Sequence, residues 1–179
     1  MILYLVPCPE NKLDLKGRET GWHRVPLDRN SKKSFRERLK QLTGKGVQYV
    51  LGSDLDTEAV HVAANELNVA PRTEFALRRL NLGRHHATPS DAIDAILGTV
   101  LEQWKSDPNI PIRGGDSLTS YQKRIVSFIR KKLTEKGTAA LITDLRTIRA
   151  LGTLSGEFDP NSFIGNGIHR EKIYVLKGE

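Results

Sequence analysis

Three residues with reactive or charged side chains stand shortly after short apolar runs: Cys8, Asp54 and Asp144. A cysteine thiolate is a nucleophile, and an aspartate can act as a general base. A thiolate at Cys8 would need a nearby cation, whereas Glu10 brings a negative charge to the same loop. Pro9 also removes a backbone N–H that a phosphate-binding loop would use. We therefore expect Cys8 to be a small buried residue at a strand end.

The other candidate ligands lack the spacing of a metal site. His61 has no second ligand one helical turn further on, and the pair His85 and His86 is typical of a surface loop. His23 and His169 stand alone in the sequence. Nearby arginines compete for the carboxylates that could surround a hard metal ion. Those carboxylates belong to Glu10, Asp54, Asp116 and Asp144. The sequence predicts no metal and no cofactor.

Apolar runs and amphipathic segments alternate along the chain, which predicts the elements that must position these residues. The expected strands are Ile2–Val6, Val47–Leu51, Ala139–Thr143 and Lys172–Leu176, with an extended piece at Phe75–Leu82. The expected helices are Ser31–Thr43, Thr57–Leu67, Pro89–Trp104, Ser117–Lys136 and Leu145–Leu154. This alternation favours an α/β three-layer sandwich, a mostly parallel sheet with helices on both faces. Ligands of such sheets bind at the carboxyl ends of the strands.

The composition is that of one globular domain spanning residues 1–179, with 38% hydrophobic and 27% charged residues. A single cysteine excludes an internal disulfide framework and a multi-thiolate zinc site. The chain lacks an apolar stretch long enough for a membrane span, and its start does not resemble a signal peptide, so we expect a cytoplasmic protein. The net charge of +7 is spread over several helices and aromatic residues are few, so we expect only weak, non-specific nucleic acid binding.

Several motifs, in order along nearly the whole chain, resemble those of the histidine phosphatase (phosphoglycerate mutase-like) superfamily. Leu5–Glu10 reads Leu-Val-Pro-Cys-Pro-Glu where the family has Leu-Val-Arg-His-Gly-Glu, and Gly17–Leu27 matches its Gly-Arg-x-x-Gly-Trp and Pro-Leu. Gly52–Leu55, Leu77–Gly83 and Gly114–Ser117 with Arg124 resemble its later motifs, as does the strand end and helix at Ile142–Leu151. The resemblance implies the phosphoglycerate mutase-like fold.

The resemblance also implies a site that this sequence does not reproduce. The family uses a phosphohistidine, a second histidine, two arginines and a proton-donating acid. Here the corresponding positions are Pro7 and Cys8 for the first arginine and histidine, Thr57 for the second arginine, Arg79 for the acid and Asp144 for the second histidine. Phosphoryl transfer needs a competent nucleophile and positive groups around the phosphoryl oxygens. Five changes together favour a pseudoenzyme with a binding, structural or assembly role.

Two alternatives stay open. One is a phosphohydrolase with an altered mechanism that uses Cys8 or Asp144. The other is a non-catalytic binder of an anionic or phosphorylated ligand, whose candidate contacts are Glu10, Arg18, Arg78, Arg79 and Arg146. The expected partner is another protein, with self-association and a small anion as alternatives and no membrane.

The expected cleft is electrostatically self-neutralised. If the strand ends meet, Arg79 or Arg146 should form a salt bridge to Asp144 or Glu10, because an unpaired buried carboxylate is costly.

Overall fold

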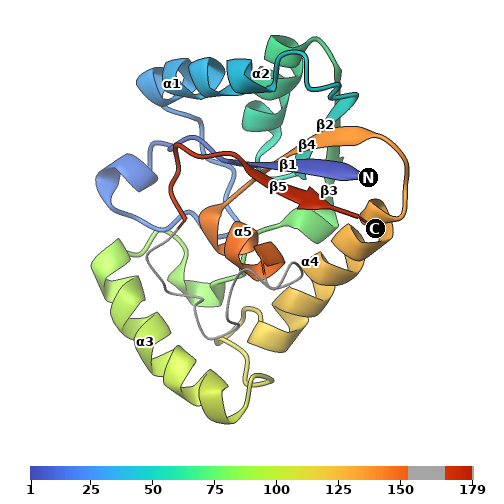
Figure 1. The fold of residues 1–179 in the computed structure, drawn as a ribbon. Coiled ribbons are helices and arrows are strands. Elements are labelled where there is room, and N and C mark those ends of the chain that lie inside the picture. Colours follow the sequence, from blue (N-terminus) through green and yellow to red (C-terminus); the bar gives the residue numbers. More distant parts are fainter. Residues whose placement is uncertain (153–167, 179) are drawn as a thin grey trace.

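The computed structural model describes residues 1–152 and 168–178 (Figure 1). At its centre is a five-stranded sheet in the order β3-β2-β4-β1-β5. The strands are β1 (Ile2–Pro7), β2 (Tyr49–Ser53), β3 (Ala70–Glu74), β4 (Thr138–Thr143) and β5 (Tyr174–Lys177). β1, β2, β3 and β4 pair in parallel, and β5 runs antiparallel to β1 at the sheet edge. The predicted α/β fold with a mostly parallel sheet is confirmed.

The helices lie on both faces of the sheet (Figure 1). They are α1 (Arg29–Leu39), α2 (Thr57–Leu67), α3 (Ser90–Ser106), α4 (Leu118–Leu133) and α5 (Leu145–Gly152). Short 3-10 turns are η1 (Asp14–Lys16), η2 (Lys40–Leu42), η3 (Phe75–Leu77) and η4 (Gly83–His85). The residue before helix α4, Ser117, is its N-cap: its side chain accepts from the backbone N–H of Ser120, and its own N–H donates to the Ser120 hydroxyl. This reciprocal cap fixes where the helix starts.

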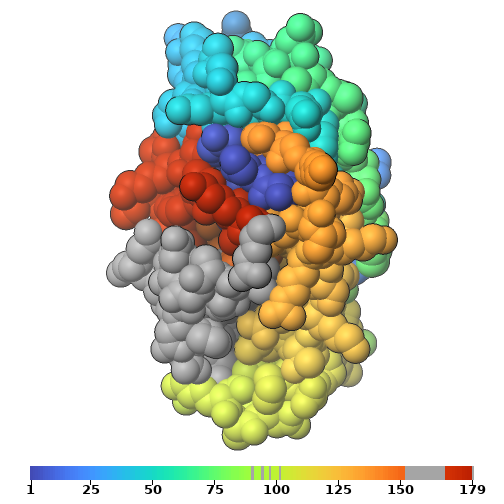
Figure 2. Space-filling view, turned by 45° about the vertical axis from the view of Figure 1, so that its right-hand side comes forward, coloured from blue at the N-terminus to red at the C-terminus, as the bar shows by residue number. Residues whose placement is uncertain are grey.

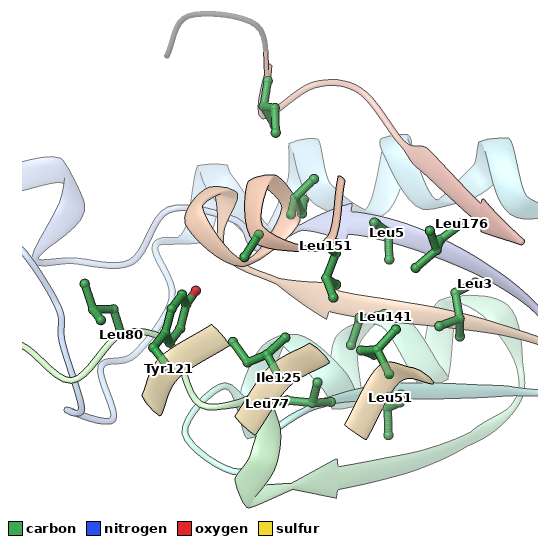
Figure 3. Packing of buried hydrophobic residues seen from close by; sticks show 14 of the residues in the cluster. Leu3, Leu5, Leu51, Leu77, Leu80, Tyr121, Ile125, Leu141, Leu151 and Leu176 are labelled. Atoms are coloured by element: carbon green, nitrogen blue, oxygen red, sulfur yellow. The ribbon is translucent and has the colours of Figure 1, made fainter. Parts of the chain in front are cut away.

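Side-chain alternation along the strands divides the core into two clusters. In β1, Leu3 and Leu5 join the cluster beneath α3, α4 and α5, whereas Val6 faces α1 and α2. Figure 3 shows side chains of the first cluster, in which leucines of the strands lie together and Tyr121 of α4 lies beside Leu80. Burying one such side chain contributes about 1.5–3 kcal/mol. Packing on both faces therefore holds the strand ends in a fixed register.

One element differs from the sequence-based expectation. The extended segment is β3, Ala70–Glu74, and the expected piece at Phe75–Leu82 instead begins with the turn η3. β3 contains Pro71, which has no backbone N–H, but β3 is an edge strand with exposed residues, where a missing N–H is tolerated. Helix α5 is described as far as Gly152, and the last two residues of the predicted Leu145–Leu154 lie outside the described residues.

The two ends of the described chain lie side by side. β5 pairs with β1, and the backbone N–H of Gly178 donates to the Met1 carbonyl at 2.9 Å. Figure 2 shows these segments next to each other on the surface. Within residues 1–152 and 168–178, no helix has the length and apolar character needed to cross a membrane.

Candidate functional site

A cleft of about 230 Å³ opens where β1 and β4 end. The loop after β1, the loop at residues 19–23, the start of α2 and the start of α5 form its walls. Its central side chains belong to Cys8, Asp56, Arg79, Asp144 and Arg146. The cleft thus lies at the carboxyl ends of two parallel strands, where ligands of α/β sheets are expected to bind.

Cys8 lies at the base of the cleft in a loop whose backbone is held on both sides. Its N–H donates to the Thr143 carbonyl at 2.7 Å, and its carbonyl accepts from the guanidinium of Arg170 at 2.7 Å. The carbonyl of Pro7 accepts from buried Arg38 at 2.7 Å. Burial, followed by the negative charge of Asp56, raises the pKa of the Cys8 thiol well above its ordinary value. The thiol is therefore protonated at neutral pH.

Arg79 is the cation at the centre of the cleft, and it forms an ion pair with Asp56. Burial opposes its charge, but the carboxylates of Asp56 and Asp144 raise the pKa of Arg79 above its ordinary value. Burial, with a smaller contribution from Asp144, also raises the pKa of Asp56 despite the ion pair. The Nε of Arg79 is buried and has no hydrogen-bond partner among the described residues.

Asp144 and Arg146 are held by other parts of the cleft wall. The Asp144 carboxylate accepts from the Thr147 hydroxyl at 2.6 Å and from the backbone N–H groups of Arg146 and Thr147 at 2.9 and 3.2 Å. It thus caps the first turn of α5. Both terminal nitrogens of Arg146 donate hydrogen bonds to the Glu19 carboxylate, at 3.0 and 2.8 Å. Each charged group here already has a partner from the protein.

Comparison with known families shows which superfamily the chain belongs to. A family model described as the histidine phosphatase superfamily, branch 1, matches residues 3–179. The chain belongs to this superfamily. No curated protein sequence matches the chain significantly.

Solved structures of other proteins share the fold of this superfamily member. YhfR of Bacillus stearothermophilus has a TM-score of 0.82 at 16% identity, over 98% of this chain and 90% of that one. A mycobacterial glucosyl-3-phosphoglycerate phosphatase in complex with VO3 has a TM-score of 0.80 at 15% identity, over 98% and 92%. The TTHB049 protein of Thermus thermophilus has a TM-score of 0.70 at 24% identity, over 89% and 87%. At these identities the likeness establishes the fold alone.

The ion pairs predicted for this superfamily member are wrong in their partners. Arg79 pairs with Asp56 and Arg146 pairs with Glu19, so neither bridges to Asp144 or Glu10. Asp144 instead binds the first turn of α5, which satisfies its carboxylate without a guanidinium. Glu10 lies outside the cleft and lines a second hollow beside the start of α1.

Four other predicted site residues also lie outside the cleft lining, and one of them, Pro7, is the last residue of β1. Arg78 forms a two-bond ion pair with Asp54 at 2.8 and 2.6 Å. Arg18 donates to the Ala87 carbonyl at 2.7 Å and so ties two loops together. Thr57 is the first residue of α2, and its hydroxyl donates to the Asp54 carbonyl at 2.9 Å.

Sequence reasoning missed the partners that neutralise the cleft. Asp56 and Glu19 are the carboxylates that pair with its arginines, while Arg38 and Arg170 bind the carbonyls of the loop after β1. Arg38 carries one detectable signal, because it falls on the apolar side of α1 next to Leu39 and is buried with it. His23, which seemed isolated in the sequence, lies with its ring centroid 4.9 Å from that of His86.

Proposed function

We propose that this histidine phosphatase superfamily member is a catalytically degenerate protein that binds another protein in a structural or assembly role. The observation that carries the proposal is the ion pair of Arg79 with Asp56 at the centre of the cleft. A phosphoryl group needs unpaired positive charge around its oxygens. The central arginine of this cleft is instead paired with a carboxylate of the protein.

The lack of a reactive nucleophile at the two strand-end positions of the cleft supports the same proposal. No histidine lines its strand-end positions, where Cys8 and Asp144 stand. Nucleophilic cysteines are activated by a lowered pKa, whereas burial raises the pKa of Cys8. Asp144 already accepts three hydrogen bonds from α5, which leaves it poorly placed to act as a general base.

The balance of charge in the cleft disfavours a small anion as the ligand. Arg146 is engaged by Glu19, and the carboxylates of Asp144 and Asp56 lie in the same cleft. An added phosphate would have to break these ion pairs and approach unneutralised carboxylates. With the fold intact and the cleft occupied by its own charges, the surface is left as the functional part of the molecule.

The test combines a turnover assay with an anion titration on the purified chain. We expect no hydrolysis above background for a broad panel of phosphomonoesters. We also expect no rise in melting temperature with inorganic phosphate or vanadate, because a ligand stabilises only the state that binds it.

Controls separate the alternatives. Turnover that disappears in Cys8→Ala or Asp144→Asn would replace the proposal with a phosphohydrolase of altered mechanism. Thermal stabilisation by phosphate without turnover, abolished in Arg146→Gln, would identify an anion binder instead. The variant His61→Asn, on the exposed side of α2, serves as a matched control for both assays.

A further inference from the structure

Two loops that are far apart in the sequence are joined beside the cleft. The backbone N–H of Ala87 donates to the Glu19 carbonyl at 2.8 Å, and the N–H of Glu19 donates to the Thr88 carbonyl at 3.0 Å. Gly21 lies so close to His86 that a Cβ at Gly21 would collide with the imidazole. The loop at residues 19–23 is therefore seated directly on the His86 ring.

The His86 ring makes one hydrogen bond that depends on its protonation state. The backbone N–H of Trp22 points at Nδ1 of His86 at 3.2 Å. An N–H can only donate, so this geometry assigns Nδ1 as the acceptor and His86 as neutral. The ring of His23 lies against the same imidazole, tilted by 40°. Burial first, and then the charges of His23 and His85, lower the pKa of His86.

The loop seated on His86 is also a wall of the cleft. Glu19, Thr20, Gly21 and His23 line the cavity. Within the same loop, the Trp22 indole N–H donates to the Arg79 carbonyl at 2.7 Å, which connects the loop to the residue carrying the central cation. Release of this loop would therefore uncover the cleft.

We propose that His86 and His23 form a pH-sensitive latch that holds the wall of the cleft closed at neutral pH and releases it on acidification. A proton from solvent adds to Nδ1 of His86 and turns the acceptor into a donor that faces the Trp22 N–H. The new imidazolium also places a positive charge directly against the His23 ring. Both changes oppose the closed arrangement. The latch does not depend on whether the cleft performs chemistry.

The charges around the latch do not offset a proton on His86. Within the described residues, the titratable groups that act on His86 are His23 and His85. Glu19 is engaged by both terminal nitrogens of Arg146, and Arg18 adds positive charge beside Ala87. Since the pKa of folded His86 lies below its ordinary 6.5, the unfolded or opened chain binds the proton first. The stability of the closed form is thus present above that value and is lost as the pH falls.

Cys8 provides a built-in reporter, because it is the chain's only cysteine and is buried in the cleft. The experiment measures its reaction with 4,4′-dithiodipyridine, in which the thiol sulfur forms a mixed disulfide and thiopyridone is released. The key variant is His86→Asn, whose side-chain oxygen can take the place of Nδ1 as an acceptor but does not titrate. Rates are compared between proteins at the same pH, so that the ionisation of the thiol cancels.

We expect wild type and His86→Asn to react at similar rates at about pH 7.5, and the ratio of the wild-type rate to the His86→Asn rate to rise several-fold as the pH is lowered to about 5. The control His61→Asn should behave as wild type. A ratio of wild-type to His86→Asn rates that does not change with pH would overturn the proposal.

Should His86→Asn fail to fold, His23→Gln tests the proposal independently by removing the neighbouring charge. That variant must raise both the pKa of His86, measured by NMR, and the pH at which Cys8 becomes reactive, and a lack of either shift would also overturn it.

Discussion

The ion pairs Arg124–Asp116 and Arg79–Asp56 have similar exposed fractions but differ in how many of their polar atoms have a hydrogen-bond partner. Arg124 pairs with Asp116 at 2.8 Å, with exposed fractions of 16% for both side chains. Arg79 pairs with Asp56, with exposed fractions of 15% and 13%. The side chains of the two pairs are thus similarly accessible to solvent, and the pairs differ in the groups that surround them.

The pair of Arg124 belongs to a completed network. Arg124 also donates to the carbonyls of Ala76 and Arg78, at 3.1 and 2.5 Å, and Asp116 accepts the N–H of Asn81 at 3.0 Å. The pair of Arg79 leaves Nε without a partner among the described residues and lies beside a second carboxylate, Asp144. The first pair joins η3 to α4 as part of the scaffold, whereas the second neutralises a cleft. Equal burial thus accompanies two different roles.

The largest effect is expected from reversing the central charge, with Arg79→Glu. Asp56 and Asp144 would then lie beside a third carboxylate and without the guanidinium that now pairs with Asp56, and we expect a loss of about 5 kcal/mol in unfolding free energy. Urea denaturation measures it. Phosphatase activity in a stable Arg79→Glu protein would contradict our interpretation, because the sequence resemblance matches this position to the acid of the superfamily.

Replacing each ion pair by apolar residues should separate the two roles. In Asp56→Leu/Arg79→Met both charges are removed together, so we expect stability within about 1 kcal/mol of wild type. In Asp116→Leu/Arg124→Met the Asn81 N–H and the carbonyls of Ala76 and Arg78 lose their partners. We expect this variant to lose about 3 kcal/mol of unfolding free energy. Urea denaturation measures the unfolding free energy of both double variants. Equal losses in the two double variants would remove the distinction drawn here.

A smaller effect is expected in the pH dependence of two neighbouring aspartates. Burial raises the pKa of Asp56, so its favourable contribution is present below its ordinary 3.8 and is lost as the pH rises through the raised value. A hydrogen bond from Arg78 lowers the pKa of Asp54, whose contribution is present above 3.8 and is lost on acidification. From about pH 3 to 7, the melting temperature relative to wild type should rise for Asp56→Asn and fall for Asp54→Asn. Parallel trends in the two variants would show that the assigned environments are wrong.

The sequence was sufficient for the fold because its signals are local and periodic. The apolar runs of β1, β2 and β4 and the helical spacing in α4 predict elements that the structure contains. Strand β3 was missed because its sequence, Ala-Pro-Arg-Thr-Glu, has neither an apolar face nor alternation. Its strand character comes from pairing with β2, which is a tertiary effect.

The site could be predicted only in part, for a similar reason. Cys8, Arg79 and Asp144 meet in one cleft because strand ends define it, as expected from the alternation of strands and helices. Which carboxylate binds which arginine depends instead on turns. Asp56 reaches Arg79 from the turn before α2, and Glu19 reaches Arg146 from a loop, and neither placement has a periodic signal in the sequence.

The most direct test of the central claim, that this cleft does not accept a phosphoryl group, is the intact mass of the protein after incubation with acetyl phosphate. The spectrum should be read at neutral pH without acid treatment, which would cleave a phosphohistidine. We predict the mass of the unmodified chain and no phosphorylated fraction. A stoichiometric phosphoryl adduct on Cys8 or on any of the five histidines would contradict the account.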